Sequence, residues 1–451
     1  MKTYLIIFGS TGNLMYKKLL PAISSLIKKK LFPDDLHILA VARRDCTLED
    51  YLEEAKEQAT AEVDWEEISK RIDYFKMDIN NVEHYQELAK KVGYKDTLKM
   101  IYLAVPPKLI SPIAKGIYEG GLVKKGNIDE RIVFEKPFGE DLQSAKEINQ
   151  MLWSYFDEKQ IYRIDHYLGK EMIQNILTVR FANRLFQESW SNHAIESVTL
   201  IAKESEGVLS RAAYYDKVGA IKDMVQSHLM QMAALIAMED PISLNANDIR
   251  DQKVDAIKHL SFDQNYILGQ YDGYLSAEGV EKNSHTETLF FGRAFIQTKR
   301  FEGVPFYFLT GKKLGEKCSE IIIKFKRGDY QDKLFASKEI PNNKLIIKIA
   351  PEDGIEFQMN TKSPGLDSFI EKASLDYCHA CRAVGNLPEA YEKLLLDLYK
   401  GQTTLFARWD EIETAWKKVS EIDKKKGNMF NYQSYQDVKD KVNQDFKEDI
   451  L

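Results

Sequence analysis

The stretch Tyr4-Leu5-Ile6-Ile7-Phe8, followed directly by Gly9-Ser10-Thr11-Gly12-Asn13-Leu14, decides how the first part of the chain folds. Its apolar run is typical of a buried strand, and residues 14–31 indicate a helix. Glycines in a strand-to-helix turn let the backbone approach a diphosphate, and the start of the helix offers N–H groups. We therefore predict a dinucleotide-binding turn. Because the spacing is G-x-x-G rather than G-x-G-x-x-G, a tight turn without a ligand is the alternative.

Further apolar strands are expected at residues 36–41, 72–77, 100–105 and 132–134, with helical stretches at 48–71, 82–92 and from Leu142 onward. Strands that alternate with helices indicate a parallel sheet covered on both faces. We predict an α/β, Rossmann-like, doubly wound N-terminal domain over residues 1–160.

The pattern changes after Lys170. Residues 171–184 and 221–238 are expected as helices, whereas strands are expected at 197–203, 289–297, 306–309, 320–325, 344–349 and 355–360. Strands that follow one another without intervening helices favour antiparallel pairing. We predict an α+β C-terminal domain over residues 161–451, with a large, mainly antiparallel sheet whose face or edge offers a surface for self-association.

Composition excludes several classes of protein. The 451 residues carry a net charge of −6, so the overall field gives nucleic acid no general attraction. No apolar run approaches the ~18 residues of a membrane span, and the N-terminus resembles a strand rather than a signal peptide. Four cysteines do not make a disulfide framework in a chain of this length, so we expect a cytoplasmic protein.

The pair Cys378-x-x-Cys381 could be redox-active or could bind a metal, but no second ligand pair follows it. We interpret both residues as structural cysteines that pack as small apolar side chains in a helical stretch. Cys46 and Cys318 receive the same interpretation, and no metal site is predicted.

The end of the second predicted strand indicates which dinucleotide is bound. NAD enzymes place an acid there for the ribose hydroxyls, whereas this chain has Arg43-Arg44. Guanidinium groups suit a 2′-phosphate, which favours NADP over NAD. Two surface arginines in a loop are the alternative, and Asp45 lies close by in sequence.

The segment Arg163–Lys170 carries the most chemistry. His166 and Lys170 are four residues apart, so on a helix they share one face and could hold one phosphate. Asp165 supplies an acceptor that could orient an imidazole. His228 is a plausible general base if a carboxylate lies within hydrogen-bond reach, although a histidine on an apolar helix is more often a core residue.

These stretches resemble the glucose-6-phosphate dehydrogenase family. The likeness is most specific in Arg163–Lys170 and covers nearly the whole chain. It includes residues 9–21, 102–107, Glu135-Lys136-Pro137-Phe138-Gly139, 181–184, 215–228, 303–306, 361–365 and 389–392. Asn13 and Ser227 depart from the family pattern, in which Asp and Asn are usual at these positions.

The resemblance implies oxidation of glucose 6-phosphate at C1 to 6-phosphogluconolactone, with hydride transfer to NADP, the first oxidative step of the pentose phosphate pathway. It implies that His228 is the base and that Asp165 orients it. The implied substrate-binding residues are His166, Tyr167, Lys170, Lys136, Glu204, Asp223, Lys312 and Lys317. The implied cofactor-binding residues are Gly9, Ser10, Thr11, Gly12, Asn13, Leu14, Arg43 and again Lys136.

The family also forms dimers and tetramers through the large sheet, so we expect a homodimer or homotetramer. Two other functions stay open: dehydrogenation of a different sugar phosphate, and non-catalytic NADP binding in a redox sensor.

Overall fold

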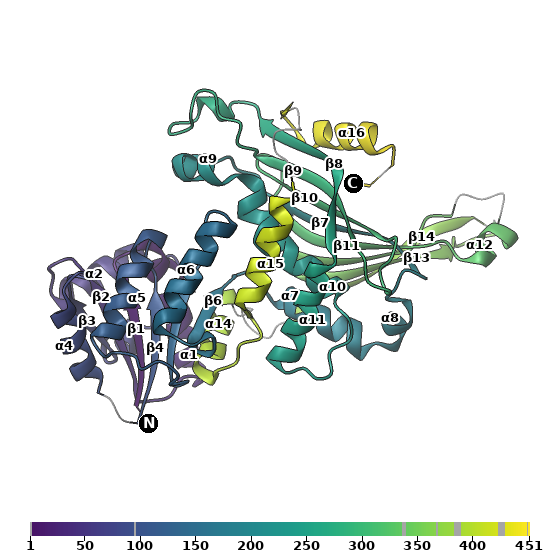
Figure 1. The fold of residues 1–451 in the computed structure, drawn as a ribbon. Coiled ribbons are helices and arrows are strands. Elements are labelled where there is room, and N and C mark those ends of the chain that lie inside the picture. The colour runs from purple at the N-terminus through teal and green to yellow at the C-terminus, as the bar shows by residue number, and fades with distance from the viewer. Residues whose placement is uncertain are drawn as a thin grey trace. The chain divides into compact units, whose positions relative to one another are not determined.

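A computed structural model describes residues 2–93, 96–335, 340–366, 369–382, 389–422, 429–448 and 450–451. The chain divides into two compact units, drawn in Figure 1. The N-terminal unit comprises Met1–Gly169, Asn245–Asn247 and Pro388–Glu413. The C-terminal unit comprises Lys170–Leu244, Asp248–Leu387 and Thr414–Leu451. The domain ranges 1–160 and 161–451 stay a prediction.

The N-terminal unit contains a seven-stranded sheet in the order β15-β6-β5-β4-β1-β2-β3. The strands are β1 (Lys2–Phe8), β2 (Leu36–Ala42), β3 (Ile72–Lys76), β4 (Thr97–Leu103), β5 (Glu130–Glu135), β6 (Ile161–Ile164) and β15 (Phe406–Ala407). All neighbouring pairs are parallel except β15 and β6. The predicted doubly wound architecture is therefore confirmed.

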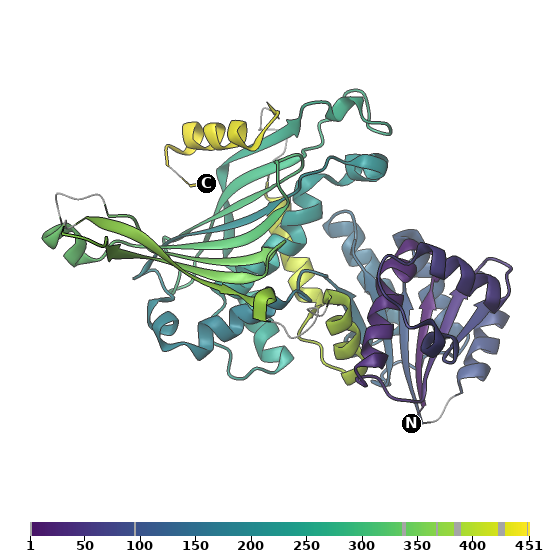
Figure 2. The same cartoon turned by 180° about the vertical axis from the view of Figure 1, so that it is seen from behind.

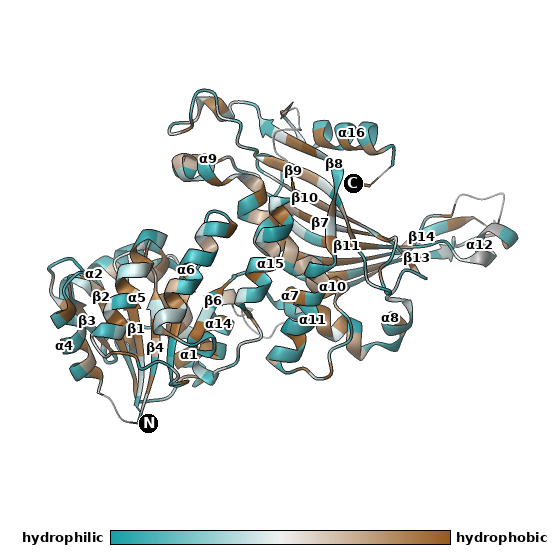
Figure 3. Cartoon of the chain, in the orientation of Figure 1, coloured by the Kyte–Doolittle hydropathy of each residue, from teal (hydrophilic) through white to brown (hydrophobic). Residues whose placement is uncertain are grey.

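Helices cover both faces of this sheet, as Figures 1 and 2 show from opposite sides. They are η1 (Met15–Leu19), α1 (Leu20–Lys28), α2 (Leu48–Gln58), α3 (Trp65–Ser69), α4 (Val82–Val92), η2 (Pro107–Leu109), α5 (Ile110–Glu119), α6 (Leu142–Tyr155), η3 (Glu158–Gln160) and α14 (Ala390–Lys400). Helices α5 and α6 carry both hydrophilic and hydrophobic residues (Figure 3), whereas Tyr4–Phe8 of β1 is buried throughout. A sheet covered on both faces requires this continuous apolar strand.

Strand order fixes where this unit can bind a ligand. The chain continues from β1 to β2 and β3 on one side, and β4 then pairs with the other side of β1. Ligands of open α/β sheets bind at such a reversal, beyond the carboxyl ends of the strands. The turn at Gly9 follows β1 at this point.

The C-terminal unit contains a nine-stranded sheet in the order β14-β13-β12-β11-β7-β10-β9-β8-β16. The strands are β7 (Ile195–Lys203), β8 (Leu260–Tyr271), β9 (Leu289–Ile296), β10 (Pro305–Gly311), β11 (Cys318–Phe325), β12 (Lys344–Ala350), β13 (Gly354–Lys362), β14 (Ile370–Cys378) and β16 (Phe430–Tyr432). Only the pairs β7–β10 and β8–β16 are parallel among the described strands of this sheet. The prediction of a mainly antiparallel sheet is confirmed.

Helices α7 (Glu171–Ala182) and α10 (Met230–Ala237) lie on one face of the nine-stranded sheet, and α16 (Tyr435–Phe446) lies on the other (Figures 1 and 2). Val438, Val442 and Phe446 of α16 pack against Tyr307 and Leu309. The remaining helices are α8 (Arg184–Ser189), η4 (Leu209–Arg211), α9 (Ala212–Ala220), η5 (Ile221–Leu229), α11 (Ala246–Lys258), η6 (Tyr274–Ser276), α12 (Asp329–Leu334), α13 (His379–Arg382) and α15 (Trp409–Ser420). Among the described residues, no helix combines the length and apolarity needed to cross a membrane.

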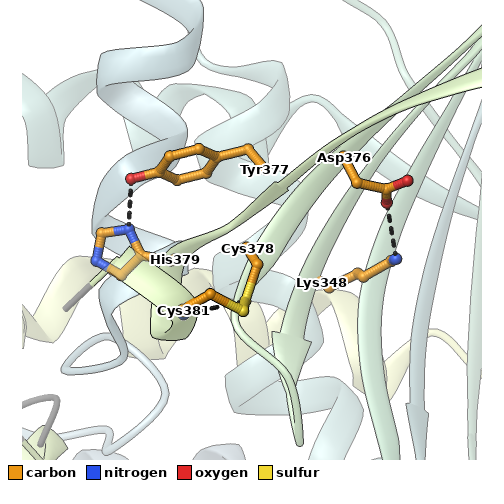
Figure 4. The surroundings of a disulfide bond; sticks show 6 residues. All are labelled: Lys348, Asp376, Tyr377, Cys378, His379 and Cys381. Atoms are coloured by element: carbon orange, nitrogen blue, oxygen red, sulfur yellow. Dashed lines mark hydrogen bonds and ion pairs between the residues drawn. A yellow bond between two sulfur atoms is a disulfide. The ribbon is translucent and has the colours of Figure 1, made fainter.

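The cysteine interpretation needs one correction. Cys378 and Cys381 form a disulfide (Figure 4) and do not pack as apolar side chains in a helix. Cys378 is the last residue of β14, and the single turn of α13 brings Cys381, which is exposed, back to it. Cys46 and Cys318 are free, and burial raises the pKa of the Cys318 thiol to about 11, which keeps it protonated at neutral pH.

Candidate active site

The turn after β1 is shaped by its glycines. Gly9 has φ +79°, and a Cβ at this position would lie 2.3 Å from the carbonyl oxygen of Ala104 on the neighbouring strand's extension. Gly12 N–H donates to the Gly9 carbonyl at 3.1 Å, and the Tyr51 hydroxyl donates to the Ser10 carbonyl at 3.2 Å. Only glycine fits at position 9, and the turn around it is held by hydrogen bonds to its own backbone.

A cavity of about 760 Å³ opens beside this turn. It is lined by the ends of β1, β2 and β4, including Gly9, Thr11, Gly12, Arg43, Ala104 and Val105. Its volume lies within the range of cofactor sites, and it lies at the reversal of strand order. The glycines leave the backbone of the turn accessible, a helix begins beside it, and Arg43 supplies a positive charge at the cavity wall. Together these features fit a dinucleotide diphosphate.

The charged residues beside the cavity have different partners. Arg44 forms an ion pair with Glu54, and Asp45 lies 2.5 Å from the Lys76 ammonium group. Arg43 is exposed, lines the cavity and makes no ion pair with any described residue. Of the two arginines, Arg43 is therefore the one that can contact a 2′-phosphate. Asp45, the acid that would suit NAD, is already paired with Lys76.

Two more predicted residues lie at the carboxyl ends of neighbouring strands. Glu135 of β5 pairs in register with Ile164 of β6, so Lys136 and Asp165 follow directly at the same edge of the sheet. Asp165 is 1% exposed, and one of its carboxylate oxygens accepts a hydrogen bond from the Tyr167 N–H at 3.0 Å. The fold therefore fixes the Asp165 carboxylate within a buried turn.

The segment from Asp165 to Gly169 is a series of turns, and α7 begins only at Glu171. The helical face expected to bring His166 and Lys170 together is therefore not formed, and that part of the prediction is wrong. The Asp165 side chain accepts a backbone N–H two residues on, which is a turn geometry and competes with a helix. The His166 ring instead contacts the ring of the nearly buried Tyr167, with centroids 5.2 Å apart.

Glu135 is a residue that the sequence analysis did not single out. Its carboxylate accepts hydrogen bonds from the hydroxyls of Tyr102 at 2.6 Å and Tyr391 at 3.0 Å. Burial raises the pKa of Glu135 to about 7 in spite of these two hydrogen bonds, and the Asp165 charge adds to the rise. The sequence signal that could have identified Glu135 is its position directly before Lys136, in the stretch 135–139 that resembles the family.

His228 lies in the C-terminal unit, on the π-helical segment η5, and is 1% exposed. Gly219, with φ +74°, interrupts the helical conformation just before η5, and a Cβ there would lie 2.6 Å from a carboxylate oxygen of Glu287. That carboxylate accepts the Ile221 N–H at 3.2 Å. Glu287, another residue missed from the sequence, therefore caps and aligns the segment that carries His228.

Three of the predicted substrate residues gather around Tyr215. Glu204, after β7, forms an ion pair with Lys312, after β10, and the Lys312 ammonium lies 4.7 Å from the centre of the Tyr215 ring. Burial, followed by the charges of Asp223, Glu287 and Glu204, raises the pKa of the Tyr215 phenol well above its ordinary value. The structure thus places a cation and several carboxylates around one buried, neutral hydroxyl.

The other predicted residues are placed by the elements that carry them. Lys317 is exposed in the turn before β11 and forms no ion pair with the described residues. Lys170, in the C-terminal unit, immediately precedes α7. Asn13 is exposed, and Leu14 is the residue directly before η1. The Ser227 hydroxyl donates to the Asp223 carbonyl at 3.2 Å, so it bonds within its own helix.

Family models match both parts of the chain. Residues 6–175 match the NAD binding domain of glucose-6-phosphate dehydrogenase, and residues 177–449 match its C-terminal domain. Glucose-6-phosphate 1-dehydrogenase of Bacillus subtilis (strain 168) is 38% identical over 447 residues, which span 93% of this chain and 91% of the relative. The enzyme of the same name from Borreliella burgdorferi is 39% identical over 442 residues, with 93% and 91% covered.

Solved structures agree with the family models. Glucose-6-phosphate 1-dehydrogenase from Mycobacterium avium matches with a TM-score of 0.86 at 32% identity, covering 96% of this chain and 94% of that one. A glucose-6-phosphate dehydrogenase in complex with its substrate glucose-6-phosphate matches with a TM-score of 0.87 at 33% identity, covering 96% and 95%. With both halves of the fold and its motifs matched, this chain belongs to the glucose-6-phosphate dehydrogenase family.

Proposed function

We propose that the protein oxidises glucose 6-phosphate at C1 to 6-phosphogluconolactone with NADP as hydride acceptor, the first oxidative step of the pentose phosphate pathway. The observation that carries the proposal is the chemistry around His228. The same unit holds this buried imidazole, on a segment aligned by Glu287, and the Glu204–Lys312–Tyr215 cluster with Asp223. A sugar phosphate requires hydroxyl partners of this kind as well as cations.

Cofactor binding follows from the N-terminal unit. The backbone of Gly9, Ser10, Thr11, Gly12, Asn13 and Leu14 would hold the diphosphate, Arg43 would hold the 2′-phosphate, and Lys136 would serve both cofactor and substrate. When bound, NADP supplies the hydride acceptor. The close approach at Gly9 and the cavity beside Arg43 support this assignment.

The protein's own chemistry is then proton removal and positioning. His228 would take the proton from the C1 hydroxyl as hydride leaves C1, and Asp165 would orient the imidazole and stabilise its protonated form. His166, Tyr167 and Lys170 would hold the phosphate, with Lys312 and Lys317 as further cations. Glu204 and Asp223 would bind sugar hydroxyls. Binding energy from a phosphate remote from C1 positions the reacting carbon.

Two alternatives fit the fold: a dehydrogenase for another sugar phosphate, and a sensor that binds NADP without turnover. Mixing the protein with NADP or NAD and a panel of sugar phosphates, and following absorbance of the reduced cofactor, separates all three. Preference for glucose 6-phosphate and NADP supports the proposal. Reduction driven mainly by a different sugar phosphate supports the first alternative, and NADP binding without any reduction supports the second.

Oligomeric state and location belong to the same proposal. We expect a homodimer or homotetramer through the nine-stranded sheet, since Met359, Leu375 and Tyr377 are at least one-third exposed and share one face of the paired strands β13 and β14. We also place the protein in the cytoplasm, with a domain boundary near residue 160. Light scattering at micromolar concentration tests the assembly, and a monomer contradicts it.

A further inference from the structure

Residues 284–288, which lie between η6 and β9, form a bridging segment that holds separate parts of the proposed substrate site. On one side, the Ala220 N–H donates to the Glu287 carbonyl at 2.9 Å, and the Ile221 N–H donates to the Glu287 carboxylate at 3.2 Å. Glu287 is 1% exposed, so both bonds are shielded from water. They fix the N-terminal end of η5, the segment that carries His228.

The bridging segment also positions Lys312, a predicted substrate residue. The Lys312 N–H donates to the Thr288 carbonyl at 3.0 Å. The buried Tyr432 hydroxyl spans the same two residues, because it lies 2.7 Å from the Lys312 carbonyl oxygen and 3.3 Å from the Thr288 carbonyl oxygen. The bridging segment therefore joins η5 to the cation that pairs with Glu204.

Asp216 of α9 holds the bridging segment in place. Its carboxylate accepts hydrogen bonds from the Ser284 hydroxyl, from the Tyr274 hydroxyl at 2.7 Å and from the Glu281 N–H at 3.1 Å. The Thr286 hydroxyl donates to the backbone carbonyl of Asp216. Burial acts to raise the pKa of Asp216, but the hydrogen bonds outweigh it and hold the pKa below the ordinary value, so the carboxylate is ionised at neutral pH.

These contacts give Asp216 a role that differs from that of a ligand. Its side chain bonds to residues 274–286, none of which is a predicted substrate or cofactor residue. Hydrogen bonds to an ionised acceptor are stronger than those between neutral groups, and three donors converge on this one. Asp216 therefore fixes the segment that in turn fixes η5 and Lys312.

We propose that Asp216 is a positioning residue for the reaction: its carboxylate locks the bridging segment, and this segment sets the places of His228 and Lys312. The inference rests on the proposed function, because these two residues matter together only if the site binds and oxidises a sugar phosphate. Without the lock, the bridging segment and the start of η5 shift together. Catalysis tolerates little displacement of a base, so the loss falls mainly on kcat.

The test is Asp216→Asn, which keeps the shape of the side chain but presents an amide NH₂ to groups that need an acceptor. We expect kcat to fall roughly 10- to 100-fold, since a displacement of about 1 Å can cost 10²-fold. The KM for glucose 6-phosphate should rise about two- to fivefold through Lys312. The Kd for NADP, measured by fluorescence titration, should stay within about twofold, because the proposed cofactor cradle lies in the other unit.

Asp263→Asn is the matched control for general loss of stability. Asp263 is a partly buried aspartate of β8 in the same unit, and its carboxylate accepts two hydrogen bonds from the Arg293 guanidinium, at 2.5 and 3.0 Å. Both variants should melt at a lower temperature than wild type, but Asp263→Asn should change kcat less than about twofold when assayed well below its melting temperature. An equal loss of kcat in the two folded variants would overturn the positioning role.

A milder variant keeps the test decisive if Asp216→Asn does not fold. Tyr274→Phe removes one hydroxyl donor to Asp216 and leaves the other two in place, so kcat should fall about two- to fivefold. A kcat equal to that of wild type in folded Tyr274→Phe and, where it folds, in Asp216→Asn would overturn the inference.

A double-mutant cycle with Glu287→Gln tests the route. If Asp216 acts through Glu287, the loss of kcat in the double variant should be clearly smaller than the product of the two single losses. A loss equal to that product would show that the two residues act separately, and it would overturn the proposed route. Absence of glucose 6-phosphate oxidation by the wild-type protein would instead contradict the proposed function.

Discussion

The two units build their halves of the chemistry in different ways. In the N-terminal unit, the proposed cofactor cradle is made mainly of the backbone of residues 9–14. A glycine is required at position 9 because a Cβ there would meet the carbonyl oxygen of Ala104. In the C-terminal unit, the cluster around Tyr215 is made of side chains from segments far apart in sequence, at positions 204, 223, 287 and 312. A local backbone site should tolerate most side-chain changes outside its glycines, whereas a dispersed side-chain site should respond to each of its members.

The largest effect is expected at His228, the buried imidazole of the C-terminal unit. His228→Asn removes the proposed base while it keeps some hydrogen bonding, so kcat should fall by ~10²–10⁴-fold with little change in KM for glucose 6-phosphate. Steady-state kinetics measure this, and thermal melting checks that the variant is folded. His166→Asn is the matched comparison, because loss of a phosphate ligand should mainly raise KM. A folded His228→Asn protein that turns over within a fewfold of wild type would remove His228 from the base role.

The backbone cradle is tested with two glycines of the same unit. Both Gly9 and Gly93 have positive φ, but a Cβ at Gly9 would lie 2.3 Å from the Ala104 carbonyl, whereas at Gly93 no described atom lies within 4 Å. Gly9→Ala should weaken NADP binding by at least ~100-fold, because relieving the clash moves the loop away from the diphosphate. Gly93→Ala should cost roughly 1–2 kcal/mol of stability and leave NADP affinity unchanged.

Fluorescence titration with NADP measures both affinities, and urea unfolding measures both stabilities. Similar NADP affinity in the two variants would show that close backbone approach at Gly9 is not what the cofactor needs.

Arg43 lines the cavity beside the cradle, and there a side chain rather than backbone should matter. Because Arg44 and Asp45 are ion-paired with Glu54 and Lys76, Arg43→Ala should raise the KM for NADP by roughly 10- to 150-fold, the value of a charge-assisted contact. The KM for NAD, which lacks the 2′-phosphate, should hardly change. Arg44→Ala serves as the control and should affect both cofactors only slightly. An equal effect of Arg43→Ala on NADP and NAD would contradict recognition of the 2′-phosphate.

The same contrast explains what could be predicted from sequence. Strands β1, β2, β4 and β5 were readable because each is a continuous apolar run between turn residues. Strand β6 was missed, since Arg163 interrupts it with a charge that is 2% exposed and ion-paired with Glu158. Strand β8 contains a polar stretch where its register with β9 shifts, between Phe262 and Tyr266. Strand β14 is an edge strand with no fully buried residue, and Glu371, Lys372 and Asp376 interrupt its apolar residues.

Site residues follow the same division. The Gly9 turn and Arg43 are recognisable because the residues that act together are close in sequence or follow strands in a fixed order. Glu287 and Tyr215 are not recognisable from spacing, because their roles arise only when β9, α9 and η5 are folded together. We expected Cys378 and Cys381 in a helix because nothing in this four-residue stretch indicates that a strand ends at Cys378.

The smallest expected effect concerns Glu135, where the backbone-built unit contains a side-chain network of its own. Burial raises the pKa of Glu135 to about 7, well above the ordinary carboxyl range. Between roughly pH 4.5 and 7, the folded protein keeps a proton that the unfolded chain has released, so this residue's contribution to stability falls as pH rises through that window.

Glu135→Gln keeps the acceptor for Tyr102 and Tyr391 but cannot ionise. At pH 8 the variant should therefore gain stability relative to wild type by roughly 1–2 kcal/mol compared with pH 5. Urea unfolding of both proteins at the two pH values, without cofactor, measures the difference.

Tyr391→Phe is the control. Removing one donor to the carboxylate should make stability depend more steeply on pH than it does in the wild type. If the stability difference between Glu135→Gln and wild type were the same at pH 5 and pH 8, Glu135 would be ionised throughout, and its carboxylate would add a second fixed negative charge beside Asp165.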